Sequence, residues 1–220
     1  MLFNSYIFIF VFLPLTLGSY YGLHKLGKPV FAKIALILMS FWFYGYFNPN
    51  YLWIMCSSII VNYLLSQLLQ RKWEMSAAQI AVLKKSLLAI GLIFNLGLIF
   101  YFKYYDFFVD NLNKVFSTDF QLKNIVLPLG ISFFTFQQVS YMVDSYRGET
   151  KEYNFADYAL FVTFFPQLIA GPIVLHNEVL PQFEDKNNWK INWDNMAHGL
   201  YMFAAGLVKK AVIADTLSVS

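Results

Sequence analysis

The sequence is short of charged residues, and this shortage excludes most classes of soluble protein. Only 13% of its 220 residues are Asp, Glu, Lys or Arg, against about 25% in an ordinary soluble domain. Hydrophobic residues make up 58% of the chain, and the mean hydropathy is +0.50. The formal net charge is only +3, and no basic stripe is interleaved with aromatic residues, so nucleic-acid binding is not expected. The composition predicts an integral membrane protein whose main partner is the lipid bilayer.

Cysteine and the common catalytic motifs are also scarce. The single cysteine, Cys56, lies inside an apolar run, which excludes an internal disulfide and a cysteine-based zinc site. The three histidines show no metal-ligand spacing, and the chain contains no Gly-x-Ser-x-Gly elbow or phosphate-binding glycine loop. We therefore predict no metal, no bound cofactor and no self-sufficient catalytic constellation. His24 belongs to a short basic loop and is expected to be solvated.

Long apolar runs account for most of the chain. A helix needs about 20 mainly apolar residues to cross a bilayer core. The sequence predicts an all-α, polytopic transmembrane helix bundle that forms a single membrane domain, with some helices broken or re-entrant. We expect six or seven membrane segments, at residues 2–22, 30–47, 51–69, 86–105, 125–146, 155–175 and 196–217.

The charges between these segments predict the orientation of the chain. Basic residues gather in the first and third loops, whereas the second loop, Asn48-Pro49-Asn50, has no charge. Basic loops stay in the cytoplasm, so the N-terminus is expected outside. The basic residues are His24, Lys25 and Lys28 in the first loop, and Arg71, Lys72, Lys84 and Lys85 in the third.

A polar face interrupts the fifth segment. Its residues recur at spacings of seven, three and four, which places them on one side of a helix. An amide or a carboxylate is costly against lipid, so this face should point at protein or at water. Hydrogen bonding between helices and a substrate path both fit, with Gln137 as the candidate substrate contact. The face consists of Gly130, Gln137, Ser140 and Asp144, and Pro128 with Gly130 suits a helix entrance.

Two prolines interrupt the sixth segment. Pro166 and the pair Gly171-Pro172 break an otherwise apolar stretch. Backbone groups freed at membrane depth are tolerated only against protein or a water-filled cavity. The segment therefore kinks, re-enters or lines a cavity, and Gln167 and His176 become candidate contacts for a polar ligand. Two amides elsewhere, Asn62 and Asn95, lie mid-segment and are expected to join helices.

An ordered series of motifs resembles a known family. The segments are residues 1–8, 41–46, 127–138, 164–173 and 206–210, and the most specific is Ala170-Gly171-Pro172-Ile173-Val174, followed by Glu178, Pro181, Gln182 and Phe183. Together they resemble the N-terminal half of membrane-bound O-acyltransferases, in the branch that contains the bacterial alginate O-acetylation membrane protein. The resemblance covers nearly the whole chain.

This resemblance implies an enzyme of the bacterial inner membrane that transfers an acyl group to a hydroxyl within a tunnel through its helices. In this branch the acceptor is an exported, alginate-like polysaccharide, the donor is expected to be acetyl-CoA, and partner proteins of polysaccharide acetylation are implied. The family's proposed acid/base histidine lies in a later helix, and no histidine follows His198. We therefore assign no catalytic residue and expect that histidine beyond Ser220. The chain is then an N-terminal portion that is inactive alone.

Other functions remain open on the residues alone. Broken helices with polar residues near the midplane also occur in transporters and channels. A non-catalytic membrane assembly subunit would need no catalytic residues at all. Among acyltransferases, D-alanyl transfer to a wall polymer and acyl transfer to a lipid or a protein are further alternatives.

Overall fold

Every regular element is a helix, and no strand occurs, in the part of the chain that the computed structural model describes, residues 1–168, 171, 174–214 and 216–217. The all-α prediction is therefore confirmed. The chain divides into two compact units, Met1–Met39 with Pro181–Ser220 and Ser40–Leu180. Helices α2 (Pro29–Gly45) and α9 (His176–Glu184) each begin in one unit and end in the other.

The first unit joins the two ends of the chain. A wide π-helical turn, η1 (Phe8–Phe12), leads into α1 (Leu13–Lys25). Near the other end, α10 (Trp193–Val208) continues into η4 (Lys209–Ala214). The rings of Phe8 and Phe203 lie 6.2 Å apart between their centroids, which places η1 against α10.

His24 is buried in this unit, so the prediction that it is solvated is wrong. Its imidazole stacks on Trp189 of the short helix η3 (Lys186–Trp189), with 4.7 Å between ring centroids. Tyr20, one turn earlier in α1, contacts the same imidazole edge-on at 4.5 Å. The contact with Trp189, which is distant in the sequence, cannot be inferred from the loop composition alone.

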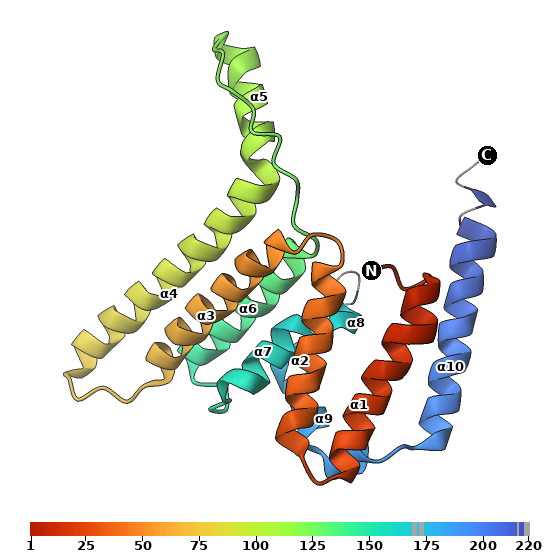
Figure 1. The fold of residues 1–220 in the computed structure, drawn as a ribbon. Helices are drawn as coiled ribbons and strands as arrows, with labels where there is room; N and C mark the ends of the chain where they lie inside the picture. The colour runs from red at the N-terminus through yellow and green to blue at the C-terminus, as the bar shows by residue number, and fades with distance from the viewer. Residues whose placement is uncertain (169–170, 172–173, 215, 218–220) are drawn as a thin grey trace. The chain divides into compact units, whose positions relative to one another are not determined.

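The second unit is built on three helices that contact one another: α3 (Asn50–Gln70), α4 (Ala77–Ile99) and α6 (Ile131–Arg147). Helix α7 (Phe155–Thr163) packs against α3 and α6, and the short α8 (Phe165–Leu168) follows it (Figure 1). The predicted segment at residues 51–69 coincides with α3.

Helix α4 continues through η2 (Phe100–Tyr104) into α5 (Tyr105–Phe116), so residues 77–116 form one helical run. Ser76 and Gln79 form a reciprocal capping box at its start. The run has 40 residues, and at about 1.5 Å per residue it is roughly twice as long as a bilayer core is thick. The chain after Tyr105, which lies between two predicted membrane segments, is therefore helical as far as Phe116.

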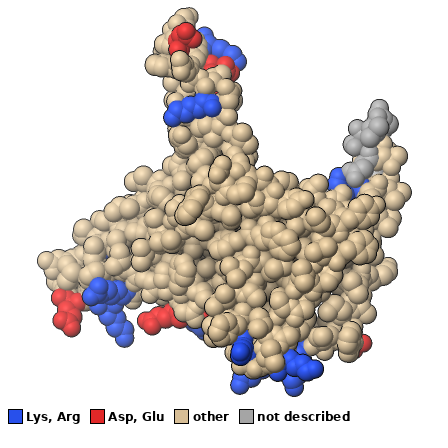
Figure 2. Space-filling model, in the orientation of Figure 1, with Lys and Arg blue, Asp and Glu red and all other residues tan. Residues whose placement is uncertain are grey.

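Within the described residues, α3 and this long run are the two helices that are long and apolar enough to cross a membrane. On α4 the exposed side carries Val82, Ile93 and Leu96, whereas Asn95 lies on the buried side. Apolar side chains outward and an amide inward suit lipid as the surrounding solvent. Charged side chains gather at the α3–α4 turn and along α5, at the two ends of the run (Figure 2).

The fifth predicted segment begins later than expected. Residues 125–130 are not helical, and α6 starts at Ile131. Gly130 precedes it with a φ of +69°, and a Cβ at this position would meet the carbonyl oxygen of Leu168. Only glycine combines this left-handed backbone with so close an approach. The helix entrance expected at Gly130 is confirmed, but Pro128 lies outside the first turn.

Candidate functional site

The break between α7 and α8 is held by side chains. Phe164 ends α7 with a ψ of 107°, and the backbone N–H of Phe165 donates to Ser40 Oγ at 3.3 Å. The carbonyl of Phe161, left without that helical donor, accepts a 2.8 Å hydrogen bond from Gln167 Nε2. The predicted interruption near Pro166 is confirmed, and its backbone groups are satisfied by protein.

The second predicted interruption lies largely outside the described residues, because Pro172 is not among them. Gly171 is described, and a Cβ there would lie 2.7 Å from the Cα of Gln167. A side chain at residue 171 would therefore have to displace the backbone of α8. The glycine is explained by this close approach.

His176 begins α9 and lies in a cage of aromatic rings. Only 3% of its side chain is exposed, and its Nε2 is 3.3 Å from Asp144 Oδ2 of α6. The edges and faces of Tyr141, Tyr153 and Phe161 surround the imidazole, with centroid distances of 5.1, 5.9 and 6.2 Å. The sequence placed Asp144 on the polar face and His176 after the break, but gave no sign that the two would meet.

The electrostatics of this pair favour a neutral imidazole. Burial lowers the pKa of His176 below its ordinary value, and the charge and hydrogen bond of Asp144 offset only part of that effect. A neutral imidazole donates from Nε2 to the carboxylate and leaves Nδ1 as an acceptor. Nδ1 is buried and has no hydrogen-bond partner within the described part of the chain. An acceptor nitrogen of this kind can accept a hydrogen bond from a hydroxyl group.

Gln137 lies on α6 one turn before Tyr141. Its side chain is 3% exposed, and its Oε1 lacks a hydrogen-bond partner among the residues that the structure describes. A buried, unpaired acceptor costs free energy and calls for a partner such as a ligand or a water molecule. Of the three predicted contacts, Gln167 and His176 are both adjacent to Phe161, through its carbonyl and its ring respectively.

A second polar cluster joins the helices of the bundle. Asn62 of α3 and Asn95 of α4 exchange two hydrogen bonds, of 3.2 and 2.6 Å, and both side chains are fully buried. Gln138 of α6 bonds Ser58 of α3 and accepts from the hydroxyl of Tyr158. The expectation that Asn62 and Asn95 join helices is confirmed, whereas the parts played by Gln138 and Tyr158 were missed.

Comparison with known proteins gives the site a family context. A family model described as MBOAT, membrane-bound O-acyltransferase family, matches residues 76–220. A peptidoglycan O-acetyltransferase of Helicobacter pylori is 42% identical over 98% of this chain and 45% of its own length. Probable alginate O-acetylases AlgI of Pseudomonas aeruginosa and Azotobacter vinelandii are 35% and 34% identical, each over 99% of this chain and 41% and 42% of their own lengths.

The chain thus spans less than half the length of these curated relatives. No solved structure matches it. Among the described residues, no group of three or more His, Cys, Asp or Glu could hold a metal ion.

Proposed function

The chain belongs to the membrane-bound O-acyltransferase family, and from that premise we propose that the protein acetylates hydroxyl groups of an exported polysaccharide. The observation that carries this proposal is the match over nearly the whole chain to relatives named for O-acetylation of two different glycans, peptidoglycan and alginate. Their shared chemistry is acetyl transfer to a sugar hydroxyl, and the polysaccharide here is alginate-like or of that broader class. Partner proteins of polysaccharide acetylation belong to the same proposal.

Gln137, Gln167 and His176 are proposed to contact the substrate. The unpaired Oε1 of Gln137 and the unpaired Nδ1 of His176 are acceptors that suit a hydroxyl group. Gln167 holds the α7–α8 break through its Nε2 and would offer its Oε1. These residues bind and orient, because the family's proposed acid/base histidine belongs to a later helix and none of the three occupies that position.

The proposal is tested in the host that carries the gene. Acetate released by mild alkali from the exported polysaccharide is measured in the wild type, in a deletion strain, and in strains with His176→Ala or Gln137→Ala. His198→Ala is the matched control, because His198 is exposed on α10. We expect each site variant to lose most of the acetate at unchanged protein level, with the control retaining it. Full acetylation in the deletion strain would refute the function.

The donor is proposed to be acetyl-CoA, since an acetyl group must reach the membrane in activated form. Membranes containing the protein are incubated with radiolabelled acetyl-CoA, and label in the polysaccharide fraction is compared with that from deletion membranes. Equal labelling in the two would exclude acetyl-CoA as the donor for this protein.

The protein is a membrane protein, and we place it in the bacterial inner membrane with its N-terminus outside. The basic α3–α4 turn then faces the cytoplasm and the end of α5 faces outward. In a Cys56→Ser background, an impermeant maleimide applied to intact spheroplasts should label Asp119→Cys. Glu74→Cys should react only after permeabilisation, and the reverse pattern would invert the orientation.

A further inference from the structure

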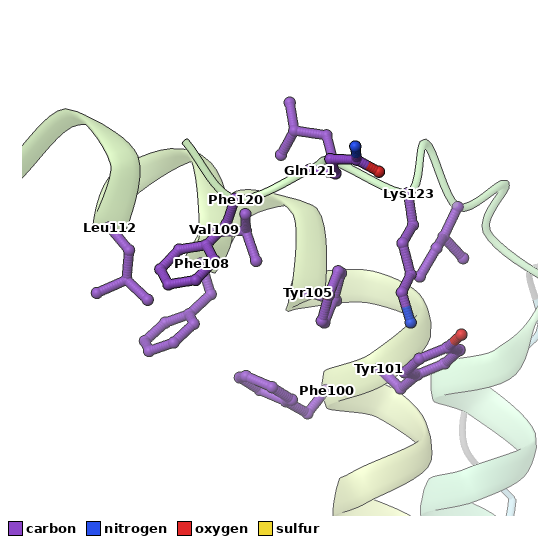
Figure 3. Close-up of a pocket in the computed structure, with 11 residues that line it drawn as sticks. Phe100, Tyr101, Tyr105, Phe108, Val109, Leu112, Phe120, Gln121 and Lys123 are labelled. Carbon is purple, nitrogen blue, oxygen red and sulfur yellow. The ribbon is translucent and has the colours of Figure 1, made fainter. Parts of the chain in front are cut away.

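A cavity of about 920 Å³ lies beside the outer part of the long helical run, within the size range of ligand sites, roughly 300–1,000 Å³. One wall comes from η2 and α5, and the other from the segment that returns toward α6 (Figure 3). Five aromatic rings and four aliphatic side chains line it, together with two polar residues, Gln121 and Lys123.

Polar side chains of the helix hold the returning segment in place. The carboxylate of Asp106 accepts 2.8 Å hydrogen bonds from the backbone N–H groups of Lys123 and Ile125. Farther along, Asn113 accepts from the N–H of Phe120 at 2.9 Å and donates to its carbonyl at 2.8 Å. The walls of the cavity are therefore fixed to each other at two levels.

Lys123 is the one cation that lines the cavity. Its Nζ lies 5.1 Å from the ring centroid of Tyr101 and 4.9 Å from that of Tyr105. Figure 3 shows the lysine reaching from the returning segment toward these two rings. Within the described residues its ammonium forms no ion pair, and the carboxylate of Asp106 bonds instead to the backbone N–H groups of Lys123 and Ile125. Aromatic faces position the ammonium without neutralising its charge.

The position of the cavity along the helical run fits the headgroup region of a bilayer. It begins at Phe100, directly after the apolar α4, and aromatic residues at that depth are typical of the headgroup region. Its rings are half-exposed, with 46% of Phe100 and 49% of Phe108 accessible. An apolar hollow with one free cation at this depth suits an amphiphile with a negative head.

We propose that this cavity binds an anionic phospholipid, with its phosphate at the Lys123 ammonium and its glycerol and upper acyl chain over Phe100, Phe108 and Leu112. The proposal involves none of Gln137, Gln167 and His176 and does not depend on the proposed function. A basic residue near a membrane surface attracts anionic lipid headgroups by about 1 kcal/mol.

Native mass spectrometry of the detergent-purified protein tests the proposal. Phosphatidylglycerol and phosphatidylcholine with the same acyl chains are titrated, and the bound fractions are compared. We expect wild type to prefer phosphatidylglycerol, and Lys123→Gln to bind it about fivefold more weakly, which corresponds to about 1 kcal/mol per basic residue near the surface. Lys123→Arg should keep the preference.

Lys114→Gln is the matched control. Lys114 lies on α5, which forms one wall of the cavity, is 71% exposed and is already paired with Asp110 at 2.6 Å, so its loss should change binding by less than twofold. Equal affinity for the two lipids in the wild type would overturn the proposal. So would an unchanged preference in Lys123→Gln, or competition by a short uronic-acid oligosaccharide. If Lys123→Gln fails to fold, the wild-type preference and Lys123→Arg decide the outcome.

Discussion

Replacing Asn95 by leucine tests whether the buried amide pair holds α4 to α3. In the native protein Asn95 Nδ2 donates to Asn62 Oδ1 at 2.6 Å, and Asn62 Nδ2 donates to Asn95 Oδ1 at 3.2 Å. Each amide also bonds a carbonyl in its own helix, Gly91 for Asn95 and Ser58 for Asn62. The substitution removes both bonds between the helices and leaves Asn62 Oδ1 buried without its donor.

The cost of Asn95→Leu follows from these contacts. Hydrogen bonds between membrane helices average about 0.6 kcal/mol each and reach about 1.7. A buried polar group left unpaired costs a further 1–3 kcal/mol or so. We therefore expect Asn95→Leu and Asn62→Leu each to lower the free energy of unfolding by about 2–3 kcal/mol, judged from these two terms. The double variant, which leaves no unpaired amide, should lose about 1–2 kcal/mol less than the sum.

The measurement is reversible unfolding in mixed micelles at increasing mole fraction of SDS, followed by tryptophan fluorescence, for wild type, both single variants and the double variant. Asn111→Leu, at an exposed position of α5, is the control and should change stability by less than about 0.5 kcal/mol. If the two single effects add to within about 0.5 kcal/mol, the amides are not coupled and the reasoning is refuted.

Two further predictions concern pH and backbone conformation. Burial lowers the pKa of both His24 and His176, so the unfolded chain takes up more protons than the folded one in weak acid. The contribution of these two histidines to the free energy of unfolding should be fully present above about pH 6.5 and be lost as the pH drops below that value. A melting temperature that is unchanged from about pH 7.5 to about pH 5 would contradict this. Gly130→Ala should reduce the yield of folded protein, because the left-handed backbone is strained and Leu168 blocks the new Cβ. Gly148→Ala, with a φ of +75° and open space around it, should cost only about 1–2 kcal/mol, so equal losses would show that the contact with Leu168 is unimportant.

The sequence predicts the helices best where one signal dominates. The segment at residues 51–69 is uniformly apolar and coincides with α3. Helix α4 begins at Ala77, because Ser76 and Gln79 form a capping box there. These residues lie before the apolar run at residues 86–105 that predicted the fourth segment. Its extension to Phe116 follows from an amphipathic pattern with Asp106, Asp110 and Lys114 on one face. A search for apolar membrane segments does not detect this part of the helix, because its residues lie beyond the apolar stretch.

The candidate site is less predictable, because it depends on pairs that are distant in the sequence. Local patterns identified the break near Pro166 and the polar character of α6. The contact between Asp144 and His176, and the use of Ser40 to bond Phe165, join residues more than 30 positions apart. Such pairs depend on how helices pack, and helical periodicity gives no information about it.

The wide turn η2 sets the rotational phase of α5 relative to α4. A π-helical turn accommodates an extra residue without completing the corresponding rotation. If Phe100–Tyr104 kept all its residues but wound as a regular α-helix, α5 would be turned by about 100° around its axis. Asp106 would then point away from the N–H groups of Lys123 and Ile125 that it now accepts from. The angular position of α5 and of the segment bonded to it thus depends on the winding of one short turn.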